Sequence, residues 1–527
     1  MTIKRNIFVV LAFLPLMVIA QERIMVISDP HVIASSLIDT TSQSFKDMIH
    51  DQRKMLDLSE PAFNAIIDTA LLYKPDLVLI PGDVTKDSEK ASHDIIVAQL
   101  QRLKEAGIPT LLIPGNHDIG GKAYAYLGEE KTAVENLTDD QWESTYSLVY
   151  QSVAAKDPDS HSFVAEPLEG VTILGIDGAH NAASTGSLSD ATQNWLLAQV
   201  DDAIEKGNMV IAMCHWQLLE HVDQQSMVVS SCRLENADEI RDSLMAHGVR
   251  VVLTGHFHVN GITTYRDTTG VIPDSIVEIT TGSPITYPCP YRWLTVSEDR
   301  SAISVETDII RSLPGFEDLE TYSREWMREH AANMVPQMTV RAFNKLEKAL
   351  DEYESDPTMG IMARLLKQCL PETDSARVDL VQRHLGSTIV ELYLLHSAAN
   401  EPEHPEADSL AQEVYAGMEA MLHEMTDEKM KYFTEIQDFL IISALTLAQE
   451  PVQSLVEDKT NWSSAKYGNV TDDLHLQLVL YSSHWPEGIE KVESGESRVK
   501  SRKVLHEGQL LIEKQGKRFS VLGAEMK

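Results

Sequence analysis

Five short apolar runs in this chain each stop at residues that can bind a metal ion. The clearest run is Leu111–Ile113, which is followed by Pro114-Gly115 and then by Asn116, His117 and Asp118. Each run has the length of a buried strand, and in an α/β sheet ligands bind beyond the carboxyl ends of strands. The pattern therefore predicts one pocket at several strand ends. The other runs are Ile24–Ser28 before Asp29 and His31, Leu77–Pro81 before Gly82-Asp83, Met209–Cys214 before His215, and Arg250–Thr254 before Gly255-His256-Phe257-His258.

These strand ends supply a mixed set of nitrogen and oxygen ligands. Such a set suits Mn, Fe, Zn, Co or Ni better than Ca or Mg. Seven ligands are too many for one ion that keeps an open position. They predict two divalent ions about 4 Å apart that share one carboxylate and a water. The candidate metal ligands are Asp29, His31, Asp83, Asn116, His215, His256 and His258.

A dinuclear centre of this kind predicts hydrolysis of a phosphate ester. The two ions attract and polarise a phosphoryl group, and they lower the pKa of a bridging water so that hydroxide attacks in line. His117 is not needed as a ligand, and we expect it to protonate the leaving oxygen or to stabilise the developing charge. We expect Asp118 to orient the ring of His117, which makes these two residues the catalytic candidates.

The five motifs resemble those of the calcineurin-like metallophosphoesterases, over about residues 24–310. The resemblance implies a four-layer α/β/β/α sandwich with a dinuclear metal centre at the strand ends. It implies that Asp83 bridges the two ions and that His117 is the acid. The segment Gly82–Lys86 resembles bacterial exported phosphodiesterase-like members. By the same resemblance, Asp29, His31 and His258 hold one ion, and Asn116, His215 and His256 hold the other.

The chain divides into four segments. We expect a signal peptide at residues 1–20, the phosphoesterase domain at 21–311, a helical domain at 312–460 and a β-rich segment at 461–527. Strand and helix alternate up to about Ile310, and helical spacing follows Leu313-Pro314-Gly315. We interpret the apolar stripe of the helical region as core packing rather than as a binding groove. Its members are Leu410, Val414, Met418, Met421 and Met425.

The N-terminus has the features of an export signal. Lys4 and Arg5 precede the apolar stretch Ile7–Ala20, which is too short for an ordinary spanning helix of about 20 residues. We expect an exported protein, periplasmic or extracellular, that is not inserted in a membrane. The formal net charge of −36 disfavours long nucleic acid as a partner. The four cysteines allow one or two disulfides in an oxidising compartment, but their spacing does not choose a pairing.

The expected partner is a small phosphate ester. The resemblance slightly favours a phosphodiester, and a nucleotide, a cyclic nucleotide and a lipid head group are the candidate substrates. His180, Asn181 and His221 are candidate substrate contacts. The alternatives are a catalytically silent metal-binding or scaffold protein that uses the helical half for a partner, and a metal-storage or sensing module. His117 and Asp118 favour an enzyme, because a purely structural metal site needs no acid beyond its ligands.

Overall fold

The computed structural model describes residues 21–445, apart from 51, 181–184, 223–224, 226–230, 268–273, 355–359, 400 and a few positions between 432 and 443. Beyond residue 445 it describes mainly short strands. The predicted signal peptide lies outside the described residues. Within the described part of the chain, no helix is both long enough and apolar enough to cross a bilayer. All four cysteines are buried and free, so no disulfide forms among them.

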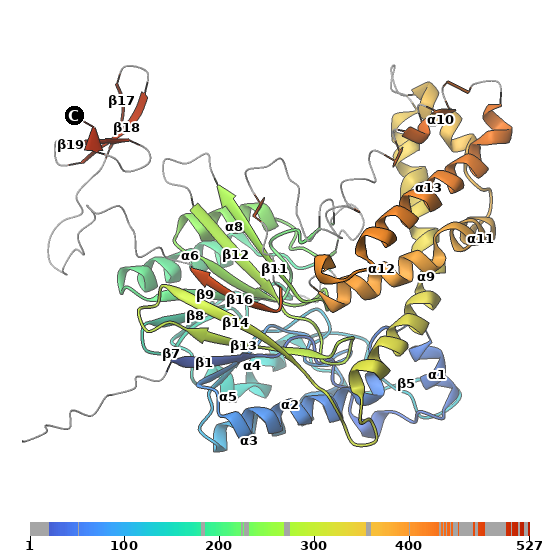
Figure 1. The fold of residues 1–527 in the computed structure, drawn as a ribbon. Coiled ribbons are helices and arrows are strands. Elements are labelled where there is room, and N and C mark those ends of the chain that lie inside the picture. Colours follow the sequence, from blue (N-terminus) through green and yellow to red (C-terminus); the bar gives the residue numbers. More distant parts are fainter. Residues whose placement is uncertain are drawn as a thin grey trace, which may run out of the picture.

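Two β-sheets form the centre of the molecule (Figure 1). The first has the order β16-β14-β13-β1-β2-β3, and the second has the order β15-β11-β12-β10-β9-β8-β7-β6. In the first sheet β1 (Glu22–Val26), β2 (Leu77–Ile80) and β3 (Thr110–Leu112) run parallel. In the second, β8 (Val171–Ile176), β9 (Met209–Cys214), β10 (Val251–Thr254) and β12 (Asp274–Thr280) run parallel. The alternation of strand and helix in the sequence predicts a layered α/β domain with a partly parallel sheet, and the structure confirms it.

Antiparallel strands complete both sheets. The first sheet continues through β13 (Pro290–Val296) and β14 (Ala302–Ile309). The second continues through β6 (Ala155–Lys156), β7 (Phe163–Leu168) and β11 (Gly261–Asp267). Smaller elements lie outside the sheets: α1 (Gln43–Ile49), β4 (Tyr124–Ala125), β5 (Thr132–Ala133) and the 3₁₀ turns η1 (Ser35–Leu37), η2 (Leu56–Leu58), η3 (Asp139–Gln141) and η4 (Glu401–Glu403).

Alternating side chains of the buried strands enter two separate cores. In β9, Met209, Ile211 and Met213 belong to the core shared with the first sheet, whereas Val210 and Ala212 belong to the core of the outer helices. This follows from the two-residue period of a strand. Helices α2 (Ser59–Tyr73) and α3 (Lys90–Glu105) pack on the first sheet. Helices α6 (Asp190–Glu205) and α8 (Ala237–Ala246) pack on the second. The layers are those of the expected α/β/β/α sandwich.

One expected helix is interrupted. The sequence predicts a helix over Trp142–Val149, but the structure has α4 (Trp142–Thr145) and α5 (Ser147–Tyr150). Tyr146 between them has φ −96° and ψ 34°, which is outside the helical region. Tyr146 is buried, and its hydroxyl bonds Nδ1 of His93 at 2.7 Å, so tertiary contacts hold the break.

Among the described residues up to Met430, five helices follow the sandwich, and they extend to one side of it (Figure 1). They share a core to which Met418, Met421 and Met425 contribute, so the predicted packing role of this stripe is confirmed. Helical spacing also predicts one apolar face formed by Phe343, Leu346, Leu350 and Tyr353, but only Phe343 and Leu350 are buried, and Leu346 and Tyr353 are exposed. The helices are α9 (Leu319–Tyr353), α10 (Gly360–Cys369), α11 (Asp374–His384), α12 (Gly386–Ala398) and α13 (Ala407–Met430).

The C-terminal strands belong to two different places in the fold. β15 (Tyr467–Gly468) pairs with β11, and β16 (His475–Val479) pairs with β14, so part of the 461–527 segment joins the sheets of the sandwich. A separate four-stranded sheet contains β17 (Arg502–His506), β18 (Gln509–Lys514), β19 (Lys517–Ser520) and β20 (Glu525–Met526).

Candidate metal centre and active site

The ends of five strands from both sheets meet at one place. β1, β2 and β3 lead to Asp29, Asp83 and Asn116, and β9 and β10 lead to His215 and His256. Backbone hydrogen bonds fasten these ends to one another. The N–H of Asp29 donates to the carbonyl of Gly82 at 3.3 Å, and the N–H of Gly255 donates to the carbonyl of His215 at 3.0 Å. The parallel register therefore brings together residues that are far apart in the sequence.

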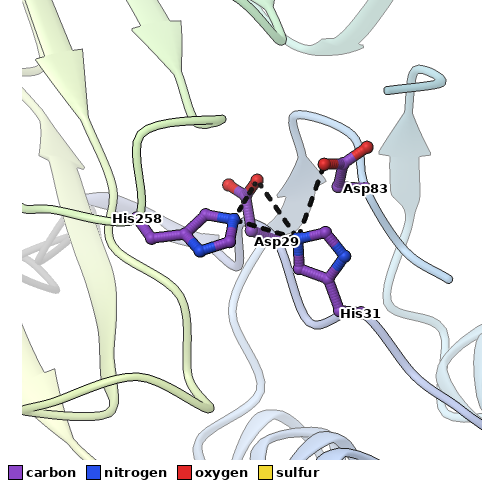
Figure 2. A group of neighbouring side chains, drawn as sticks. All are labelled: Asp29, His31, Asp83 and His258. Carbon is purple, nitrogen blue, oxygen red and sulfur yellow. Dashed lines mark hydrogen bonds and ion pairs between the residues drawn. The ribbon is translucent and has the colours of Figure 1, made fainter. Parts of the chain in front are cut away.

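The first ligand cluster contains Asp29, His31, Asp83 and His258, and all four are buried (Figure 2). Nε2 of His258 lies 3.3 Å from Oδ1 of Asp29, and Nε2 of His31 lies 3.5 Å from Oδ2 of Asp83. The two Nε2 atoms are 2.9 Å apart. All of these ligand atoms lie within 4.8 Å of one another, which is close enough for one ion to bind them together.

The second cluster contains His215 and His256 and again Asp83. Nε2 of His215 lies 3.3 Å from Oδ2 of Asp83 and 3.2 Å from the amide oxygen of Asn116. Because Asp83 belongs to both clusters, it has the position of a bridging ligand. Every one of the seven candidate metal ligands is therefore brought into one centre.

The histidine tautomers in the second cluster fit a bound cation. Nδ1 of His215 lies 2.9 Å from the carbonyl of Pro81, and Nε2 of His256 lies 3.0 Å from the carbonyl of Ser231. A carbonyl only accepts, so these nitrogens carry the hydrogens. In neutral imidazoles the other two nitrogens then face each other with lone pairs, 3.2 Å apart. A cation between them stabilises that arrangement, and the outward N–H bonds fix the ring orientation.

The motif glycines allow the backbone to approach the ligands closely. A Cβ on Gly115 would lie 2.2 Å from Oδ1 of Asp83, and a Cβ on Gly255 would lie 2.3 Å from Oδ2 of Asp29. Neither contact is sterically possible for a real side chain. Glycine is therefore required beside each of these carboxylates.

Five of the seven candidate ligands have left-handed backbone conformations, with φ between 41° and 66°. Each such residue costs about 1–3 kcal/mol when it is not glycine, and such strain is concentrated at functional sites. The strand ends hold this strain because the surrounding hydrogen bonds fix them. The five are Asp29, His31, Asp83, His256 and His258.

His117 is held by a carboxylate that the sequence analysis did not assign. Nδ1 of His117 lies 2.8 Å from Oδ1 of Asp87, and the His117 ring meets the His31 ring edge-on at 4.8 Å. Burial raises the pKa of Asp87, but the hydrogen bond from His117 and the charge of Lys86 outweigh it and lower that pKa to about 2. Asp87 is therefore an ionised acceptor, and Nδ1 of His117 carries the hydrogen.

The prediction that Asp118 orients His117 is wrong. The Asp118 carboxylate accepts hydrogen bonds from the N–H groups of Gly115, Val84 and Thr85, at 2.8, 3.1 and 2.8 Å. It is fully buried between the loops that follow β2 and β3, so it fastens those loops together instead of reaching the imidazole. The only signal for Asp87 in the sequence was its place four residues after Asp83, beyond a Gly-Asp turn.

The three predicted substrate contacts have different surroundings. His221 is partly buried and lies against Glu278, with Nε2 and Oε1 2.9 Å apart, and it also lines a small pocket beside Phe257 and His396. His180 lies beside Asp139, with Nδ1 and Oδ2 3.3 Å apart. Asn181 lies outside the described residues. Neither His180 nor His221 belongs to the two ligand clusters of the centre.

Two basic side chains that the sequence analysis did not single out lie close to the centre. The guanidinium of Arg53 donates to the carbonyl of Phe257 at 3.3 Å and contacts the Tyr393 hydroxyl of α12. Lys54 interacts electrostatically with the carboxylates of Asp83 and Asp87. No sequence motif marks this pair, because only the fold brings them beside the metal ligands.

Residues 22–260 match the family model described as calcineurin-like phosphoesterase. This part of the chain is a calcineurin-like phosphoesterase domain. The expected family resemblance is confirmed, and the calcineurin-like phosphoesterase domain contains every candidate metal ligand together with His117 and Asp87.

Two curated relatives match part of this domain. A probable cyclic nucleotide phosphodiesterase of Moraxella catarrhalis is 25% identical over 198 residues, which is 37% of this chain and 63% of the relative. A human protein named serine/threonine-protein phosphatase CPPED1 is 24% identical over 227 residues, which is 42% of this chain and 64% of the relative. The chain thus spans slightly less than two thirds of the relatives' lengths, and the relatives carry both phosphodiesterase and phosphatase names.

Solved structures with some likeness include a dimetal phosphatase from Danio rerio, with 14% identity and a TM-score of 0.39. That match covers 54% of this chain and 95% of the other. A purple acid phosphatase from yellow lupin matches with 14% identity and a TM-score of 0.33, over 55% of this chain and 52% of the other.

Proposed function

We propose that this protein hydrolyses a small phosphate ester at a dinuclear divalent metal centre, and that a phosphodiester is favoured over a monoester. The observation that carries the proposal is the pair of ligand clusters joined by Asp83 beside a non-ligand His117. A site that only stores or senses metal has no use for an imidazole held by its own carboxylate. The relative named as a cyclic nucleotide phosphodiesterase supports the preference for diesters.

The roles of the residues follow from their positions. Asp29, His31 and His258 would hold one ion, His215, His256 and Asn116 the other, and Asp83 both. Ions bound there supply Lewis acidity that offsets phosphoryl charge. With Nδ1–H of His117 donated to Asp87, its other ring nitrogen, Nε2, is left to transfer a proton to the leaving oxygen. The His117 side chain is 30% exposed, so a substrate can reach it.

Arg53 and Lys54 extend the site toward the helical region. Within the described part of the chain neither side chain forms an ion pair with a carboxylate, which is notable in a chain of net charge −36. Burial lowers the pKa of Lys54 to about 8, although Asp83 and Asp87 raise it. We propose that Arg53 and Lys54 bind an anionic group of the substrate that is not transferred. Tyr393 of α12 would hold Arg53 in position.

Turnover assays that detect the released alcohol, nucleotide or inorganic phosphate test the proposal, because hydrolysis of a diester releases an alcohol and leaves a phosphate monoester. Purified protein is incubated with aryl phosphate monoesters and diesters and with nucleotides, cyclic nucleotides, phospholipid head groups and sugar phosphates, with Mn, Fe, Zn, Co or Ni supplied in turn. Asn116→Ala and His256→Ala should abolish turnover and reduce bound metal. His247→Ala, which alters a partly exposed histidine paired with Asp201, is the matched control. Metal binding without turnover on any ester would favour the silent scaffold or storage alternatives.

We also propose that the protein is exported and that its mature form begins near Gln21. The support is the Lys4-Arg5 pair followed by the apolar stretch Ile7–Ala20. N-terminal sequencing of the protein recovered from its native host tests this. A chain that still begins at Met1 and stays in the cytoplasm would refute it.

A further inference from the structure

A second group of metal-ligating side chains lies outside the catalytic clusters. Asp139, His161 and His180 offer one carboxylate oxygen and two imidazole nitrogens that lie within 4.8 Å of one another. The group draws on three separate segments. Asp139 begins η3, His161 precedes β7, and His180 follows β8. We propose that these three residues bind one further divalent transition-metal ion, distinct from the catalytic pair.

Each imidazole has a nitrogen at ligand spacing from the Asp139 carboxylate, one beside each carboxylate oxygen. Nε2 of His161 lies 3.2 Å from Oδ1 of Asp139, and Nδ1 of His180 lies 3.3 Å from Oδ2 of Asp139. Ligand atoms of a tetrahedral site with bonds of about 2.0–2.2 Å lie about 3.3–3.6 Å apart. The catalytic cluster has the same spacing, with 3.3 Å between His258 and Asp29.

The surroundings of the two imidazoles fit a bound cation, although Nε2 of His161 is also within hydrogen-bond distance of Asp139. Nδ1 of His180 is buried and makes no hydrogen bond to a described residue, although a carboxylate oxygen is only 3.3 Å away. Nδ1 of His161, whose side chain is 10% exposed, is also without a hydrogen bond but lies 3.6 Å from Oε1 of Glu143. If Nε2 of His161 binds an ion, its Nδ1–H points to the Glu143 carboxylate. That is the usual outer partner of a metal-bound histidine.

The loops that carry the histidines are fastened before any ion binds. The buried Asp177 carboxylate accepts the N–H of His161 at 3.0 Å and the N–H of Ala179 at 2.8 Å. One side chain therefore sets the spacing of His161 and of the residue before His180. Two imidazoles and a carboxylate suit Zn, Fe, Co or Ni better than Mg or Ca. The His180 side chain is 36% exposed, which leaves an open side for a water or another ligand.

Metal content measured on the full chain tests the proposal. After equilibrium dialysis at a fixed buffered free zinc concentration, metal per chain is measured by mass spectrometry. The unaltered protein should hold one ion more than His161→Gln or His180→Gln. Asp140→Asn, at the exposed neighbour of Asp139, and His247→Gln are matched controls that should keep the full metal content.

Two further measurements keep the test independent of folding and of the proposed hydrolase activity. The difference of one ion should persist in an Asn116→Ala background, in which the catalytic centre is impaired. Co²⁺ titration of the unaltered chain should give visible absorption bands that His180→Gln reduces, while the circular dichroism spectrum is unchanged. Equal zinc content in the unaltered chain and in both histidine variants would overturn the proposal, because Asp139 would then only pair with the two imidazoles.

Discussion

Replacing Asp87 by Asn should lower kcat without removing the metal ions. The change keeps the size of the side chain but removes the negative charge that lies 2.8 Å from Nδ1 of His117. A hydrogen bond to a charged group contributes about 1.5–3 kcal/mol. This stabilisation is greatest when His117 is protonated, the form that acts as the acid. Its loss corresponds to a decrease of about 10- to 100-fold in kcat. KM should change little, because Asp87 belongs to neither ligand cluster.

A double-mutant cycle with His117→Ala tests whether Asp87 acts through His117. His117→Ala alone should cost about 10²- to 10⁴-fold in kcat, the usual range for a general acid. In that background Asp87→Asn should have almost no further effect, since residues that act as a unit are not additive. Asp94→Asn, at an exposed aspartate paired with Lys90, is the matched control. The reasoning is refuted if Asp87→Asn reduces kcat equally in both backgrounds, or if it leaves kcat unchanged.

Three further outcomes follow from the site. Gly115→Ala should reduce bound metal and lower the free energy of unfolding by about 1–3 kcal/mol, because its Cβ would overlap Asp83. Gly128→Ala places a Cβ in open space and should change neither the bound metal nor the free energy of unfolding. Metal analysis and urea unfolding measure both quantities, and equal results for the two variants would contradict this prediction. Arg53→Ala should raise KM more than it lowers kcat for an ester with a second anionic group, and equal KM values would remove Arg53 from substrate binding. Chelation of the metal should lower the melting temperature, because ions that bind only the folded chain contribute about 2.7 kcal/mol at a hundredfold excess over Kd. An unchanged melting curve would contradict ion binding at the centre.

The alternation of strand and helix and the five strand-end motifs were enough to predict a layered α/β domain and one shared set of candidate metal ligands. Strand runs with apolar residues on both faces require cover on both sides, and polar residues at their ends require a common edge, so Asp29 and His256 were predictable although 227 positions separate them. The apolar stripe of α13 was likewise readable, because helical periodicity is a local property.

The carboxylate that bonds to His117 follows only from the way the loops pack together. Asp118 follows His117 directly in the sequence, but its side chain accepts hydrogen bonds from the backbone of two loops. Asp87, in the loop that follows β2, contacts the His117 ring instead. The same holds for Arg53, which reaches α12, and for His180, which meets Asp139 instead of the catalytic centre. Side-chain direction at a loop depends on packing between segments distant in the chain, and no local pattern of residues encodes it.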